Sequence, residues 1–98
     1  MIVRFRSEAD IELHEALEWY RQQRLGLEFE FMRCMDETIS RIKRNPDMFP
    51  IALQNSRKAM IKRFPYTIYY EVGDDEIMIL AVFHSSRNPE HWQRRALS

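Results

Sequence analysis

Alternation of apolar and charged residues opens the chain and predicts a strand. From Ile2 to Arg6, Val3 and Phe5 fall on one side and two arginines on the other, which is the period of a half-buried β-strand. The pattern changes after Ser7. The following apolar residues recur at helical spacing to about Arg24, and the glutamates fall mostly outside their stripe, which is formed by Ala9, Leu13, Ala16, Leu17 and Tyr20.

The limits of this first helix are marked by short-range signals. Ser7 with Asp10 three residues later resembles a capping box and predicts the helix start. Gly26 stands where a helix end favours a left-handed residue. A second helical stripe begins immediately after it and ends at Asn45-Pro46. The two helices are expected to form a hairpin, joined to each other and to the sheet by Trp19, Tyr20, Phe31 and Met35.

The second half of the chain has the composition of strands. Residues 57–61 are a weak strand candidate, and the aromatic and β-branched run after Pro65 predicts a strand to Val72. Gly73-Asp74-Asp75 predicts a turn, and Glu76 to Phe83 returns as a nearly continuous apolar strand, which is expected to be central and covered on both faces. Residues 90–97 form a short amphiphilic tail that is expected to be helical.

This order of elements predicts the fold class α+β. The expected arrangement is β-α-α-β-β-β, with an N-terminal helical hairpin packed on a small, mainly antiparallel sheet and a short C-terminal helix. With 98 residues and neither repeats nor linkers, the chain is expected to be one domain spanning residues 1–98.

Composition restricts the cellular setting. No apolar run is long enough to span a bilayer, so no membrane partner is expected, and Arg4 and Arg6 interrupt any secretory signal. The single cysteine, Cys34, cannot form an intrachain disulfide. We therefore expect a cytoplasmic protein.

Charge is balanced overall but divided along the chain. The 15 basic residues equal the 15 acidic residues, which disfavours DNA binding through bulk charge. Residues 1–37 nevertheless carry five basic and nine acidic residues, whereas residues 38–70 carry seven basic residues and one acidic residue. An acidic polypeptide or a polyanion could therefore dock on the basic middle segment.

Candidate chemistry is confined to the ends of the last two strands. His14 with Glu15 and Glu18 lacks the second histidine of a zinc-protease helix, and no phosphate-binding loop or nucleophile motif is present, so no metal and no cofactor are expected. Pairing of the two strands should bring Arg63 near His84. With Arg87, these residues could cleave RNA without a metal, His84 carrying the proton and the arginines stabilising the phosphate. The competing interpretation is that the histidine and the nearby aromatic residues are ordinary packing residues.

The sequence resembles the RelE/ParE superfamily of toxins from bacterial type II toxin-antitoxin modules. The resemblance covers nearly the whole chain, and no single tetrapeptide is diagnostic. It is carried by the order and spacing of Arg63-Phe64-Pro65-Tyr66, Val82-Phe83-His84-Ser85-Ser86-Arg87-Asn88-Pro89, Trp92 and Arg95. Supporting pieces are Ala16-Leu17-Glu18-Trp19-Tyr20, the joint at Leu25-Gly26-Leu27 and the turn from Asn45-Pro46 to Phe49-Pro50. The β-α-α-β-β-β order predicted from periodicity is the fold of that superfamily.

The resemblance implies a toxin neutralised by a cognate antitoxin, with operator DNA contacted only through the antitoxin. The spacing looks more ParE-like, of the plasmid stabilisation type, which implies inhibition of DNA gyrase by protein contact. In that case Trp92, Arg94 and Arg95 are the candidate target-binding residues. The alternative is a RelE-like endoribonuclease that cuts mRNA on the ribosome with Arg63, His84 and Arg87 as catalytic residues. A third possibility is a degenerate module that only binds partners.

Overall fold

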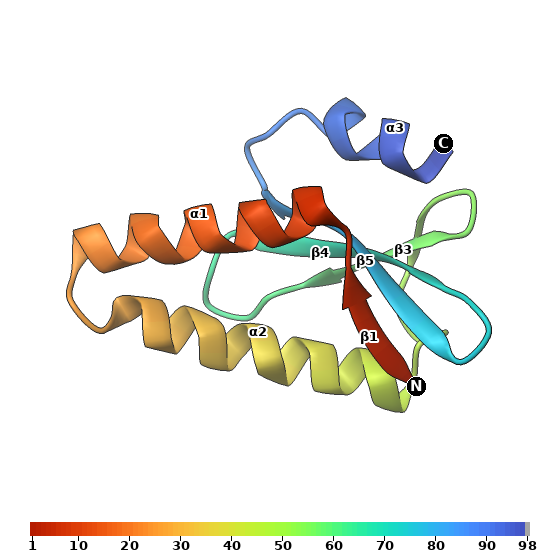
Figure 1. Cartoon of the computed structure of the whole chain (residues 1–98), viewed down its shortest axis with the longest axis horizontal. Helices are drawn as coiled ribbons and strands as arrows, with labels where there is room; N and C mark the ends of the chain where they lie inside the picture. Colours follow the sequence, from red (N-terminus) through yellow and green to blue (C-terminus); the bar gives the residue numbers. More distant parts are fainter. Residues whose placement is uncertain (98) are drawn as a thin grey trace.

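The computed structural model describes residues 1–97 and confirms the α+β class (Figure 1). One five-stranded sheet has the strand order β1-β5-β4-β3-β2, in which β1 is parallel to β5 and every other pair is antiparallel. In chain order the elements are β1 (Ile2–Phe5), α1 (Ser7–Gln23), α2 (Leu27–Arg44), β2 (Ile51–Leu53), β3 (Ser56–Met60), β4 (Tyr66–Val72), β5 (Glu76–His84) and α3 (Glu90–Leu97).

Two layers of helix cover opposite faces of this sheet. The hairpin of α1 and α2 packs on one face, and α3 packs on the other, at the end of the sheet where β5 finishes (Figure 1). Strand β5 is therefore buried on both sides, as its continuous apolar sequence predicts. No helix in the described part of the chain is long and apolar enough to cross a membrane.

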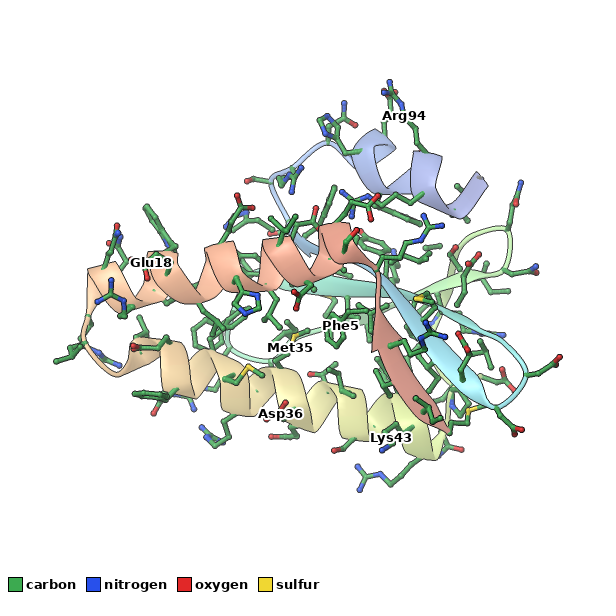
Figure 2. All side chains as sticks on the ribbon, viewed as in Figure 1. Phe5, Glu18, Met35, Asp36, Lys43 and Arg94 are labelled. Atoms are coloured by element: carbon green, nitrogen blue, oxygen red, sulfur yellow. The ribbon has the colours of Figure 1, made fainter. Side chains whose placement is uncertain are left out.

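The helical hairpin follows the sequence closely. Gly26 has φ 96°, the left-handed conformation that glycine adopts without steric cost, and α2 starts at the next residue. The start of α1 differs from the prediction, because Arg6 occupies the cap position and the Ser7 hydroxyl bonds to the Glu8 carboxylate (3.3 Å) instead of capping the helix. In Figure 2, Met35 lies between the two helices.

Strand β2 was not predicted. It is three residues long, its first residue is exposed, and its pairing with β3 is irregular between Ile51 and Leu53. So short a segment at the edge of a sheet has no period that a sequence pattern could reveal. The weak strand candidate at 57–61 is confirmed as β3, shifted by one residue.

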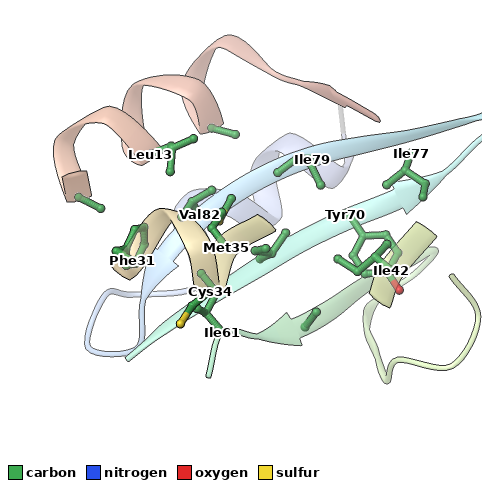
Figure 3. Packing of buried hydrophobic residues seen from close by; sticks show 14 of the residues in the cluster. Leu13, Phe31, Cys34, Met35, Ile42, Ile61, Tyr70, Ile77, Ile79 and Val82 are labelled. Carbon is green, nitrogen blue, oxygen red and sulfur yellow. The ribbon is translucent and has the colours of Figure 1, made fainter. Parts of the chain in front are cut away.

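The hairpin face holds the larger part of the core (Figure 3). Tyr20 and Phe31 stack at 5.2 Å between ring centroids, and Phe64 and Tyr66 meet Phe31 edge-on at 5.1 and 5.2 Å. Such offset and edge-on contacts add stabilising free energy to that gained by burying the apolar surface of the rings. These four aromatic rings join the tip half of the helical hairpin to the start of β4.

A bulge in β5 assigns its residues to the two faces. Tyr69 pairs with Ala81 but Tyr70 pairs with Ile79, so Leu80 is an extra residue in β5. Because of this insertion, Ile79 and Val82 both reach the core under the hairpin, although they are three residues apart. Ala81 and Phe83 lie on the opposite face of the sheet, where they pack with Trp92 of α3.

Candidate functional site

A cavity of about 250 Å³ opens between α1 and the end of β5, and it contains two of the three predicted catalytic residues. A larger cavity of about 590 Å³ follows the turn between β4 and β5 and contains none of the predicted site residues. We therefore describe the smaller one, called here the α1 pocket, as the candidate site. It is lined by Glu12, Glu15, Ala16, Trp19, Tyr66, Val82, His84 and Arg87.

His84 is the last residue of β5, opposite Tyr66 in the sheet, and their rings meet edge-on at 5.2 Å. Its Nδ1 accepts a hydrogen bond from the backbone N–H of Ser86 (3.0 Å) and lies 2.8 Å from the Ser86 hydroxyl oxygen. A backbone N–H can only donate, so Nδ1 carries no proton in the neutral ring, and the proton is on Nε2. In this arrangement His84 offers a donor at Nε2 and has no free lone pair there with which to act as a base.

Arg87 is held by an acidic residue and an aromatic ring. Its Nη1 donates to Glu12 Oε2 (3.1 Å), and its guanidinium lies 4.0 Å from the centre of the Phe83 ring. The Glu12 side chain is only 8% exposed, so this carboxylate needs compensation by cations and hydrogen bonds. The charge of Arg87 is therefore largely engaged within the protein itself.

Glu12 also receives a second arginine and a backbone group. Arg95 of α3 contacts both carboxylate oxygens (3.0 and 2.9 Å), and the backbone N–H of Val82 donates to Oε1 (3.1 Å). The same arginine donates to the carbonyl of Leu80 (3.0 Å). We call Glu12, Arg87 and Arg95 the Glu12 network; it ties α1, α3 and β5 together.

The Glu12 network exists because β1 is much shorter than β5. β1 ends at Phe5, and the last backbone bond on this side runs from the Arg6 N–H to the Ile79 carbonyl (3.0 Å). Beyond it, β5 has no neighbouring strand on that edge, and buried backbone groups need other partners. The carboxylate and guanidinium groups supply them at Val82 and Leu80.

Arg63 does not join His84 and Arg87, so the expected closeness of Arg63 and His84 is not found. β4 begins only at Tyr66, and Arg63 precedes it with φ 72°. Its Nη2 forms an ion pair with Glu30 of α2 (3.1 Å). The side chain is 62% exposed and does not line the α1 pocket.

The three predicted target-binding residues lie in different environments. Trp92 is 1% exposed and stacks on Tyr69 with 3.9 Å between ring centroids, so its place in the structure is one of packing. The Arg95 side chain is 14% exposed and belongs to the Glu12 network. Arg94 alone of the three projects into solvent (Figure 2).

Trp92 was expected at the surface and is buried, whereas Trp19 was expected in the core and is exposed. It was expected to join the helices, but its side chain is 56% exposed at the margin of the α1 pocket, whereas its neighbour Tyr20 packs in the aromatic core. The helical periodicity of the sequence already indicates this exposure, because Trp19 lies outside the apolar stripe of α1. The sequence analysis also did not identify Glu12 as a site residue. Glu12 lies three residues after Ala9 and four before Ala16, so helical spacing places it on the buried side of α1.

The polar groups of the α1 pocket act on Tyr66. Burial raises the pKa of the Tyr66 hydroxyl; the nearby Arg87 guanidinium lowers this pKa and the Glu15 carboxylate raises it. Tyr66 therefore stays protonated at neutral pH and can donate a hydrogen bond. Within residues 1–97, no group of three His, Cys, Asp or Glu side chains could hold a metal ion.

Two comparisons with known proteins agree with the architecture. A sequence model of the family described as "ParE toxin of type II toxin-antitoxin system, parDE" matches residues 3–89, which leaves α3 outside the matched span. A solved structure described as "Chromosomal ParDE TA system from P. aeruginosa" is similar in fold, with a TM-score of 0.61 and 17% identity over 86% of this chain and 95% of that chain. A search of the curated proteins finds no match.

Proposed function

The chain belongs to the ParE toxin family of type II toxin-antitoxin systems, and we propose that it arrests bacterial growth by binding a protein target, DNA gyrase, without cleaving RNA. Gyrase is the target that the ParE-like sequence pattern implies. Because gyrase acts on the chromosome, the proposal keeps the cytoplasm as the place of action. The ribosome-dependent ribonuclease remains the alternative that the experiment below must exclude.

The observation that carries this proposal is that Arg63, His84 and Arg87 are each engaged elsewhere. A metal-free ribonuclease needs a base for the ribose hydroxyl and cations aimed at the scissile phosphate. Arg63 pairs with Glu30 and Arg87 with Glu12, while the backbone of Ser86 holds His84 in the donor tautomer.

The acidic side chains of the α1 pocket support the same conclusion. Glu15 lines it and makes no ion pair within the described part of the chain, so a phosphodiester entering there would meet the charge of this carboxylate. The arginine at the same place, Arg87, is ion-paired with Glu12, which also pairs with Arg95. Like charges at close range disfavour binding, so the pocket is poorly suited to an RNA backbone.

An antitoxin partner is part of the proposal, and the basic segment 38–70 is its proposed docking site. We expect the free toxin to expose an apolar strip flanked by basic residues, and this strip cannot lie on the second half of β5, which is buried. Segment 38–70 instead exposes three large apolar side chains, those of Met48, Ile51 and Met60. An acidic and apolar segment of the antitoxin would complement these residues and the lysines among them.

Purified protein tested on gyrase decides between the two activities. We expect it to inhibit DNA supercoiling, and we expect His84→Gln to keep its potency to within a few-fold, because inhibition by contact needs no proton transfer and glutamine keeps a hydrogen-bond donor at this place. A ribonuclease would instead lose roughly 100-fold or more of its activity with this change. Cleavage of mRNA in cells, mapped at the same induction level, is the matching measurement for that alternative.

Arg63→Ala is a useful companion to His84→Gln. It removes the arginine that pairs with Glu30 at an exposed site, so the fold should survive. Full growth arrest by both variants supports the binding mechanism. Growth arrest that is lost in both folded variants, accompanied by mRNA cleavage in the wild type, would refute it.

A further inference from the structure

The outward side of α1 carries an unusual combination of residues. Ile11, Glu15 and Trp19 are four residues apart, so they lie along one side of the helix. Ile11 is 58% exposed and Trp19 is 56% exposed, and they are separated by two turns, about 12 Å. We call Ile11, Glu15, Trp19 and the adjoining α1 pocket the α1 face.

The aromatic packing of the hairpin is provided by the residue next to Trp19. Its neighbour Tyr20 already contacts Phe31, Phe64 and Tyr66 inside the core. No stacking or cation–π contact involves Trp19 within residues 1–97. A tryptophan more than half exposed beside a pocket is the kind of residue that dominates protein interfaces.

Glu15 gives the α1 face its charge. It is exposed and makes no ion pair within the described part of the chain, unlike Glu18, which is held by Arg21, and Glu12, which lies in its network. The nearby cation, Arg87, is ion-paired with Glu12, which it shares with Arg95, and does not pair with Glu15. A carboxylate that faces outward without a partner, next to an aromatic side chain, favours a basic group on whatever binds there.

The α1 pocket has room for one long side chain and walls suited to a guanidinium. Tyr66 and His84 contribute ring surfaces, Trp19 stands at the margin, and Glu15 is the available counter-ion. Arginine combines stacking on aromatic rings with paired hydrogen bonds to a carboxylate, which lysine does not match.

We propose that the α1 face is the surface with which this toxin binds its protein target, taking a basic side chain, an arginine, into the α1 pocket beside Trp19 with Glu15 as its counter-ion. This inference rests on the proposed function and deepens it. It also separates two partners by charge: the target binds the acidic α1 face, whereas the antitoxin binds the basic segment 38–70. The tail residues Arg94 and Arg95 are then not the principal target contacts.

Matched variants on the two helices test the proposal. Trp19→Ala and Glu15→Arg change the α1 face. Phe29→Ala and Asp36→Arg make the same kinds of change on α2, where Phe29 is 73% exposed and Asp36 is exposed without an ion pair within residues 1–97 (Figure 2). We expect the α1 variants to need about tenfold or more toxin for half-inhibition of purified gyrase, and the α2 variants to stay within about twofold of the wild type.

A second measurement isolates the charge. Inhibition by the wild type should weaken as salt is raised, and Glu15→Gln should weaken inhibition while reducing that salt dependence. Thermal melting of each variant near the wild-type temperature establishes that the fold is intact. Equal potency of folded Trp19→Ala, Glu15→Arg and wild type, or an equal loss in Phe29→Ala, overturns the proposal.

Results that refute the proposed function can be distinguished from results that refute only the α1 face. If the wild type inhibits neither gyrase nor growth, the function itself is wrong and the inference falls with it. If the wild type arrests growth without inhibiting gyrase, the target is another protein, and the ranking of the same four variants in growth arrest decides the inference. Weaker growth arrest by the α1 variants than by the α2 variants supports the inference. Equal growth arrest by the two pairs refutes it.

Discussion

The two faces of the sheet are packed in very different ways. Under the hairpin, buried side chains from α1, α2, β3, β4 and β5 form one continuous cluster. On the other face, Trp92 of α3 packs against Ala81 and Phe83, with Tyr69 and Leu53 at its margin. A core shared by many elements makes a local change global, whereas a helix attached at one place can be loosened by itself. The first face is therefore the folding core, and the second holds a separable element.

The comparison is tested most strongly by Phe31→Ala. Phe31 is fully buried and contacts three other aromatic rings, so its removal should lower the free energy of unfolding by about 3 to 5 kcal/mol. Denaturant unfolding of the purified protein measures this. Phe29→Ala, two residues away and exposed, should change stability by less than about 0.5 kcal/mol. Similar stabilities for both variants would place the core elsewhere.

Trp92→Ala should have a smaller effect on the whole molecule and a larger one on α3. The indole is buried, but its site lies beside a short helix that can detach, so we expect a loss of about 2 kcal/mol and rapid hydrogen exchange confined to α3 and the end of β5. His91→Ala, exposed on the same helix, is the control. Cooperative loss of the entire fold would show that the two faces are not separable.

Glu12→Gln tests what connects the faces. Glutamine keeps an acceptor for the Val82 N–H but leaves two arginines without their counter-ion, which should lower stability by about 1 to 2 kcal/mol. Glu15→Gln on the same helix should leave stability unchanged. If Glu12→Gln were as stable as the wild type, the network would contribute little and α3 would be held by Trp92 alone.

The last effect is confined to high pH. Burial of Tyr70 raises its pKa to about 12, and its hydroxyl donates to the carbonyl of Pro46 (2.6 Å). The folded state therefore prefers the neutral phenol, a contribution fully present below the unfolded pKa near 10 and lost as the pH rises toward 12. The melting temperature of Tyr70→Phe should therefore fall less than that of the wild type as the pH rises over this range. Thermal melting of both proteins at a series of pH values measures this. An identical pH dependence in the two proteins contradicts the assignment.

The sequence predicted the elements of the hairpin face better than the contacts of the other face. Gly26, the two helices and the strands after Pro65 follow local rules of backbone geometry and period, which act over a few residues. β2 was missed because three irregular residues at a sheet edge have no period. α3 was placed correctly, but so short a helix does not show which of its sides is covered, so Trp92 was expected outside.

The candidate site depended on distances that the sequence does not contain. Equal spacing from the turn placed His84 correctly beside β4 but could not show that β4 starts three residues after Arg63. The Glu12 network joins residues more than 70 positions apart and arises from the unequal lengths of β1 and β5. Trp19 was assigned to the core because of its residue type, although its position on α1 pointed outward.

The parallel pairing of β1 with β5 also has a consequence for the timing of synthesis. Ile2 lies opposite Glu76, so β1 leaves the ribosome well before β5 and has no partner strand until β5 has emerged. The helical hairpin, held by contacts between neighbours in the chain, can form long before. We therefore expect a nascent chain that is helical early and acquires its sheet late, so that the toxin stays inactive throughout most of its own translation.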